Sequence, residues 1–71
     1  MDINSEMMIY KTIAITELKE KPSKFSDTIK IIPENRLLIV SNFISGFAKT
    51  KQGFINEDDI EFAFCYNEEE T

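Results

Sequence analysis

Apolar and polar residues follow a different period in each part of this chain, and each period predicts an element. Residues 7–15 (MMIYKTIAI) are rich in β-branched and aromatic residues and lack Gly and Pro, which predicts a first strand. Residues 36–44 (RLLIVSNFI) contain almost no polar residue in their first half, which predicts a central strand covered on both faces. After the break at Gly46, residues 47–50 (FAKT) are expected to form a partner strand.

Between the first two strands the apolar residues change to a helical spacing. They recur at alternating four- and three-residue steps: Leu18, Pro22, Phe25, Ile29 and Ile32. This spacing predicts one apolar stripe along a helix over residues 17–32. Thr16 is a suitable N-cap, Pro22 interrupts the helix, and Ser23 can cap its second part.

These elements predict an α+β fold, in which a three- to four-stranded antiparallel or mixed sheet packs against a Pro-broken helix. The 71 residues fit one small domain, with residues 1–6 and 67–71 as flexible ends. A chain of this length buries only about 60% of the surface that its unfolded form exposes. Domains with so small a core often gain stability when two copies associate, so the prediction includes a homodimer as an option.

The C-terminal segment fits two structures. As a helix it would be capped by Asn56, with three acids in its first turn. As a strand it would place its large side chains on one face: Ile60, Phe62, Phe64 and Tyr66. Because period two with aromatic residues is typical of strands, we predict one capped turn over residues 56–59 followed by a final strand.

Charge is distributed unevenly along the chain. Residues 11–51 hold all eight Lys and Arg residues against four acids (net +4), whereas residues 52–71 hold seven acids and no base (net −7). The formal net charge of −5 argues against general affinity for nucleic acid, which requires bases to neutralise phosphates. The acidic end has two explanations, which are solubility and recognition of a basic partner.

The residue types needed for catalysis or metal binding are scarce. The chain has no His, and its one cysteine, Cys65, has acids rather than bases nearby in sequence. The acidic segment lacks the alternating ligands and the central Gly of a calcium loop. We therefore predict no enzyme activity, no catalytic residue, no metal ligand and no cofactor.

The predicted compartment follows from two features that the sequence lacks, a pair of cysteines and a long apolar stretch. A single cysteine makes no internal disulfide, which is typical of a reducing compartment. No stretch approaches the roughly 20 apolar residues that span a bilayer. We predict a cytoplasmic protein with no membrane partner.

Binding needs only a surface, and the C-terminal segment offers rings beside carboxylates. Exposed rings can anchor a protein partner, and acids can steer a basic one toward them. The rings can equally belong to the core, and both explanations stay open. The predicted partner-binding residues are Glu57, Asp58, Asp59, Glu61, Phe62, Phe64, Tyr66, Glu68, Glu69 and Glu70.

The basic middle of the chain suggests an alternative function. A small dimeric DNA-binding regulator would have to bring the bases of residues 11–36 onto one face. The residues proposed for DNA contact are Lys19, Lys21, Lys24, Lys30 and Arg36. The lysines also fit the solvated outer face of an amphipathic helix.

The stretches KTIAITELKEKPSKFSDTIK and NRLLIVSN, within residues 11–42, resemble the N-terminal part of Phd/YefM-type antitoxins. The resemblance implies an α+β dimer whose bases, here Lys19, Lys21 and Lys24, contact operator DNA. It also implies an acidic C-terminal segment that wraps a basic ribonuclease toxin. The function predicted is therefore a non-catalytic inhibitor, antitoxin-like or of a phage anti-defence type, that neutralises a basic, nucleic-acid-processing protein.

Overall fold

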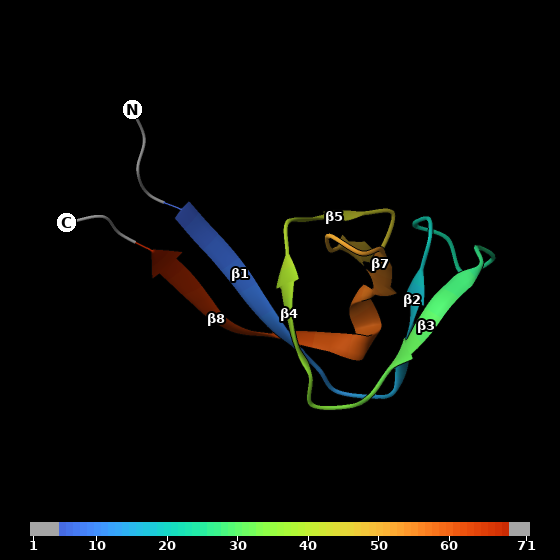
Figure 1. The fold of residues 1–71 in the computed structure, drawn as a ribbon, viewed down its shortest axis with the longest axis horizontal. Helices are drawn as coiled ribbons and strands as arrows, with labels where there is room; N and C mark the ends of the chain where they lie inside the picture. The colour runs from blue at the N-terminus through green and yellow to red at the C-terminus, as the bar shows by residue number, and fades with distance from the viewer. Residues whose placement is uncertain (1–4, 69–71) are drawn as a thin grey trace.

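Two antiparallel sheets make up residues 5–68, the part of the chain that the computed structural model describes (Figure 1). The three-stranded sheet has the order β4 (Leu37–Val40), β1 (Ser5–Thr12) and β8 (Ile60–Glu68). The five-stranded sheet has the order β3 (Thr28–Ile32), β2 (Thr16–Lys19), β7 (Phe54–Asn56), β6 (Phe47–Lys49) and β5 (Asn42–Ile44). Within these residues the only helical element is the 3₁₀ turn η1 (Glu57–Asp59).

The predicted α+β fold is wrong, because the segment expected to form the broken helix forms β2 and β3. These strands pair in antiparallel register, with Thr16 opposite Ile32 and Leu18 opposite Lys30. Leu18 is buried, whereas Phe25, from the same predicted stripe, is 87% exposed. The helical spacing was therefore coincidental, and alternation in β2 with β-branched residues in β3 decided the structure.

The other strand predictions had mixed outcomes. The first strand is confirmed as β1, although it ends at Thr12 rather than at residue 15. The predicted strand of residues 36–44 divides at Ser41 into β4 and β5, and each is an edge strand of a different sheet. The expected hairpin is confirmed as β5–β6, with Ser45 and Gly46 both at positive φ in its turn.

The capped turn and the final strand of the C-terminal segment are confirmed. Asn56 accepts a hydrogen bond at its side-chain oxygen from the Asp58 N–H, at 2.8 Å, and this caps η1. β8 then runs antiparallel to β1 toward the chain ends (Figure 1). The outermost pairs are Ser5 with Glu68 and Glu6 with Asn67, so these four residues are paired where flexible ends were expected. The remaining expected flexible residues, 1–4 and 69–71, lie outside the described part.

The core lies between the two sheets. Val40 and Ile60 come from the three-stranded sheet, and the remaining core residues come from the five-stranded sheet: Leu18, Ile32, Ala48 and Ile55. Tyr10 and Leu38, on the same side of the three-stranded sheet, pack against this cluster at its margin. So small a core leaves many apolar side chains of the described residues exposed. No helix in this part of the chain is long and apolar enough to cross a membrane.

Thr12, at the end of β1, holds the β3–β4 turn in place. Its hydroxyl donates to the Pro33 carbonyl at 2.7 Å and accepts from the Arg36 N–H at 2.8 Å. Its backbone N–H donates to the Arg36 carbonyl, and its carbonyl accepts from the Asn35 N–H. Asn35 adopts a positive φ of 67°, which suits the centre of a tight turn. One fully buried side chain thus fixes the start of β4 beside the end of β1.

Replacing Thr12 with Val should test this role, because Val keeps the shape but removes both side-chain hydrogen bonds. The Pro33 carbonyl and the Arg36 N–H would each lose a partner next to a buried methyl group. We expect a loss of about 1–3 kcal/mol in the free energy of unfolding, measured by urea denaturation. Thr12→Ser retains the hydroxyl and should lose less. Equal stability of Thr12→Val and the wild type would contradict this account.

Candidate functional site

β8 carries most of the residues predicted to bind a partner, and its pairing with β1 determines where each side chain lies. Tyr10 lies opposite Phe62, but Ile9 lies opposite Phe64, and Met7 lies opposite Tyr66. The register therefore shifts by one residue between Ile9 and Tyr10, and Ala63 is the extra residue of a β-bulge. Because a shift of one residue moves side chains to the other face, the bulge redistributes the rings.

The prediction that Phe62, Phe64 and Tyr66 share one face is therefore wrong. Phe62 lies on the inner face of the sheet, defined here as the face that bears Tyr10 and meets the core. There the Tyr10 ring packs edge to face against Phe62 and Phe43, with centroids 5.5 and 5.4 Å apart. Phe64 and Tyr66 lie on the outer face, defined as the face that bears Ile9. The rings thus flank both sides of one strand.

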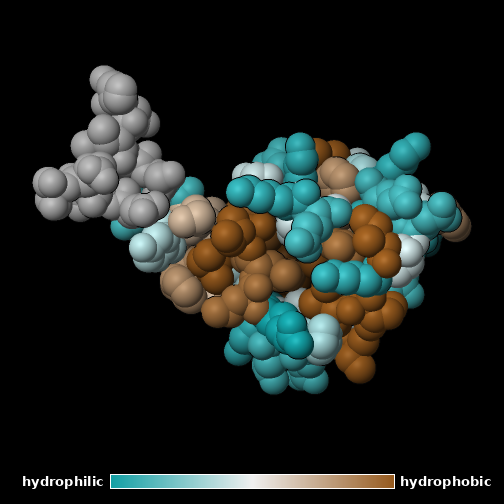
Figure 2. Space-filling view, viewed as in Figure 1, coloured by the Kyte–Doolittle hydropathy of each residue, from teal (hydrophilic) through white to brown (hydrophobic). Residues whose placement is uncertain are grey.

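The outer face carries an apolar strip next to the Lys11–Glu61 ion pair and is left uncovered by the described chain. Ile9, at its centre, is only 8% exposed because Ile39 and Phe64 lie on either side of it. Phe64 and Tyr66 are each 47% exposed, and Leu37 is 58% exposed. Figure 2 shows hydrophobic side chains along the β1–β8 ribbon, beside the grey ends. Leu37 and Ile39 could not be assigned to this face from the sequence, because a run of four apolar residues does not indicate which two face the core.

The acids predicted to bind a partner fall into three groups. Glu57 and Asp58 are exposed in η1, and Glu61 forms an ion pair with Lys11 at 3.8 Å in which both side chains are partly exposed. The Asp59 carboxylate instead accepts a hydrogen bond from the buried Thr16 hydroxyl at 2.6 Å, and this ties η1 to β2. Glu68 ends β8, and Glu69 and Glu70 lie outside the described residues.

The bases of the alternative function do not form one cluster. Lys21 and Lys24 lie in the loop between β2 and β3, and Lys24 stacks over the Phe25 ring at 5.5 Å. Lys30 is on β3, and Arg36 lies beyond the far end of that strand, so roughly 15 Å of β3 separates it from the loop. The Lys19 ammonium group already makes contacts within the fold. It pairs with Glu17 at 2.7 Å and donates hydrogen bonds to Thr28 and to the Ser26 carbonyl.

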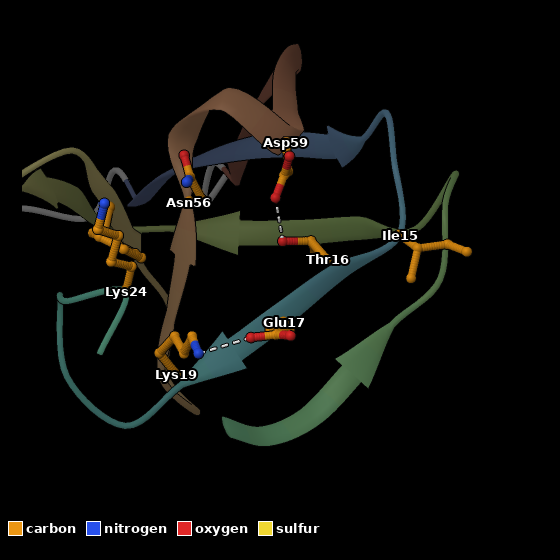
Figure 3. A pocket seen from close by; sticks show the side chains of 8 residues that line it. Ile15, Thr16, Glu17, Lys19, Lys24, Asn56 and Asp59 are labelled. Carbon is orange, nitrogen blue, oxygen red and sulfur yellow. Dashed lines mark hydrogen bonds and ion pairs between the residues drawn. The ribbon is translucent and has the colours of Figure 1, made fainter. Parts of the chain in front are cut away.

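A depression of about 250 Å³ lies between β2 and η1 (Figure 3). Its polar side chains bind one another: Thr16 with Asp59, and Glu17 with Lys19. Hydrogen bonds from Lys19 and Thr28, and the positive charge of Lys19, lower the pKa of Glu17 below its usual value. The arrangement therefore stabilises ionised Glu17.

Metal ligands are not gathered anywhere in residues 5–68, where no three His, Cys, Asp or Glu side chains lie close enough to share an ion. Cys65 is a free, exposed thiol on β8. What the described chain does present is the β8 site, defined here as Phe62, Phe64 and Tyr66 with the flanking acids Glu57, Asp58 and Glu61.

The direction of the backbone groups of β8 follows from one hydrogen bond. The Ile13 N–H donates to the Asp59 carbonyl at 2.9 Å, which makes Thr12 and Ile60 a non-hydrogen-bonded pair. Such pairs alternate with hydrogen-bonded pairs along β1, so the partners of Lys11, Ile9 and Met7 direct their N–H and C=O groups toward β1. The N–H and C=O groups of Phe62, Cys65 and Asn67 consequently point to the free edge.

Amide hydrogen exchange should alternate along β8. The N–H groups of Glu61, Phe64 and Tyr66 are bound within the sheet, whereas those of Phe62, Cys65 and Asn67 meet solvent. We expect the second group to exchange about tenfold faster or more, measured residue by residue by NMR. Uniform protection in both groups would show that a further strand already covers the edge.

Removal of the Lys19 charge should raise the pKa of Glu17 toward its usual value. In Lys19→Met we expect the Glu17 carboxyl to titrate at higher pH than in the wild type, followed by NMR. Because the folded-state pKa is lowered, the pair stabilises the fold above the unfolded-state pKa of Glu17, and this stabilisation is lost as the pH falls through the folded-state pKa. Lys30→Met is the control, and an unchanged Glu17 titration in Lys19→Met would contradict the assignment.

Comparison of the chain with protein-family models, with curated proteins and with solved structures gave no significant match. The α+β fold that the antitoxin resemblance implied is absent from the described residues, and the family relationship itself stays a prediction.

Proposed function

We propose that this chain is a non-catalytic protein-binding inhibitor that neutralises a basic, nucleic-acid-processing partner through the β8 site. One observation carries the proposal: every side chain from Glu61 to Asn67 is exposed, on a strand that ends its sheet. Three of these side chains are aromatic rings about half exposed to solvent. A small core leaves many apolar side chains exposed, but these three rings lie together along the free edge of one strand, where a single partner could contact them all.

Rings and carboxylates have separate roles in this proposal. Aromatic side chains bury a large area with little loss of conformational entropy, so they supply most of the binding energy. Glu57, Asp58 and Glu61 raise the association rate of a basic partner and disfavour acidic ones. The chain's net charge of −5 acts in the same direction at longer range.

The geometry changes the set of residues proposed to bind. Asp59 is assigned to the fold, because its carboxylate is bound to Thr16. Glu68, the last residue of β8, and Glu69 and Glu70, which follow it in sequence, remain in the proposal as charges. A cytoplasmic setting is part of the proposal, since the Cys65 thiol is exposed and free. An antitoxin and a phage anti-defence protein both fit such an inhibitor.

No observation favours the DNA-binding regulator over this function. Its residue Lys19 is bound within the fold, and Arg36 is far from the loop that bears Lys21 and Lys24. DNA binding is therefore one of the outcomes that the capture experiment below distinguishes.

Neutralising the exposed acids of the β8 site should weaken partner binding. We expect the triple variant Glu57→Gln, Asp58→Asn, Glu61→Gln to bind about tenfold more weakly, because exposed charges contribute roughly 0.2–1 kcal/mol each. The partner is first isolated by affinity capture from the host at moderate salt and identified by mass spectrometry. Its dissociation constant is then measured with purified proteins.

The matched control removes the same charge outside η1 and β8, in Glu20→Gln, Asp27→Asn, Glu34→Gln, all of them exposed. An equal loss of partner affinity in both variants would show that the effect comes from the net charge of the chain alone. Unchanged binding by the first variant would contradict an acidic recognition surface. Retention of DNA without any protein partner would favour the regulator.

A further inference from the structure

We infer that the partner contributes an extended basic segment, which adds to the three-stranded sheet as a fourth strand along residues 64–68 of β8. This inference rests on the proposed function and specifies its binding mode. It follows from the free edge of β8, the side chains beside that edge and the charge around it.

The free edge of β8 lacks two of the features that usually prevent strand addition. Edge strands are commonly protected by Pro, by Lys and other charged side chains, by bulges or by short length. β8 contains neither Pro nor Lys, and its one charged residue beyond the bulge is Glu68, at its end. The bulge at Ala63 is its one interruption, and a bulge disturbs pairing on either side of it. A regular edge therefore remains beyond the bulge, from Phe64 to the end of the strand.

Backbone groups for pairing are available on this part of the edge. Because Phe64 and Tyr66 direct their backbone groups toward β1, Cys65 and Asn67 direct theirs outward. Together they offer two N–H donors and two C=O acceptors. An added strand would bind these four groups, as in other cases of strand addition.

Side chains beside the edge would contact both faces of an added strand. On the outer face, Phe64 and Tyr66 would flank every second residue of the partner. On the inner face, Cys65 and Asn67 are exposed and would flank the others. Alternate residues of the partner segment would therefore meet the two rings on the outer face, which favours aliphatic side chains there, and a thiol and an amide on the inner face.

The negative charge of η1 and β8 determines which kind of segment can bind at this edge. Residues 57–68 contain five acids, Glu57, Asp58, Asp59, Glu61 and Glu68, and no base. A second copy of this chain would bring a second β8 without any base to the shared edge, and the two chains, each with a net charge of −5, would repel one another. A segment with Lys or Arg among its aliphatic residues would meet opposite charge instead. The occupant is therefore a basic strand of another protein and not a second β8.

The test uses the full chain and a defined probe, an acetylated peptide of alternating Lys and Val, with a Glu–Val peptide as control. We expect the Lys–Val peptide alone to bind, and to slow exchange at the amides of Cys65 and Asn67 about tenfold or more. Cys65→Pro removes an outward N–H without breaking the β1–β8 pairing, and should weaken peptide binding about tenfold. Cys65→Ala keeps the N–H and should bind as the wild type does.

Several results would overturn strand addition. These are equal affinity for the Glu–Val peptide, no affinity for the Lys–Val peptide, or unchanged binding by a folded Cys65→Pro. A dimer in sedimentation whose Cys65 and Asn67 amides are already protected would assign the edge to a second copy. Should Cys65→Pro fail to fold, Asn67→Pro serves the same purpose, and the exchange measurement needs no variant.

The inference and the proposed function fail differently. If the captured partner binds folded Cys65→Pro normally but loses affinity for the Glu57, Asp58, Glu61 amide variant, the inhibitor proposal stands and strand addition is wrong. If the amide variant keeps full affinity for the partner, the acidic recognition surface itself is wrong.

Discussion

The buried hydroxyl of Thr12 is the interaction on which the placement of the other elements depends. Four hydrogen bonds, two from its side chain and two from its backbone, join the end of β1 to the β3–β4 turn. They stop β1 at Thr12 and let the chain leave for the other sheet as β2. They also bring β4 back beside β1 in a register that puts Leu38 and Val40 toward the core. Leu37 and Ile39 are thereby turned to the outer face.

The β1–β8 bulge has a comparable effect on the other side of β1. If Ala63 paired with Ile9 in a regular register, Phe64 and Tyr66 would join Phe62 on the inner face, where the margin of a small core already holds Tyr10 and Phe43. Because Ala63 bulges out of the register, the rings are supplied to both faces. Bulges often serve to re-aim side chains in this way near sites of function.

Local patterns in the sequence predicted the elements whose structure is set locally. The β5–β6 hairpin, the Asn56 cap and the final strand depend on Ser45-Gly46, on one Asn side chain and on period two. The predicted helix over residues 17–32 is wrong, because the spacing of the apolar residues did not indicate that Phe25 would face solvent. The split at Ser41 and the bulge at Ala63 arise from pairing with strands distant in sequence, so no local pattern could reveal them. The acids were placed correctly in η1 and β8, yet the bond from Thr16 to Asp59 joins residues 43 apart and needed the fold.

The edge of β8 has a further consequence for how this protein behaves at high concentration. A long strand with exposed rings, free backbone groups and no Lys or Pro is the kind of segment that stacks into fibrous aggregates. In this chain the surrounding carboxylates provide the colloidal protection that β8 itself lacks. The net charge of the chain falls to zero at the isoelectric point near 4.6. Acidification to that pH therefore lowers the charge repulsion that opposes self-assembly through the same edge that we assign to recognition.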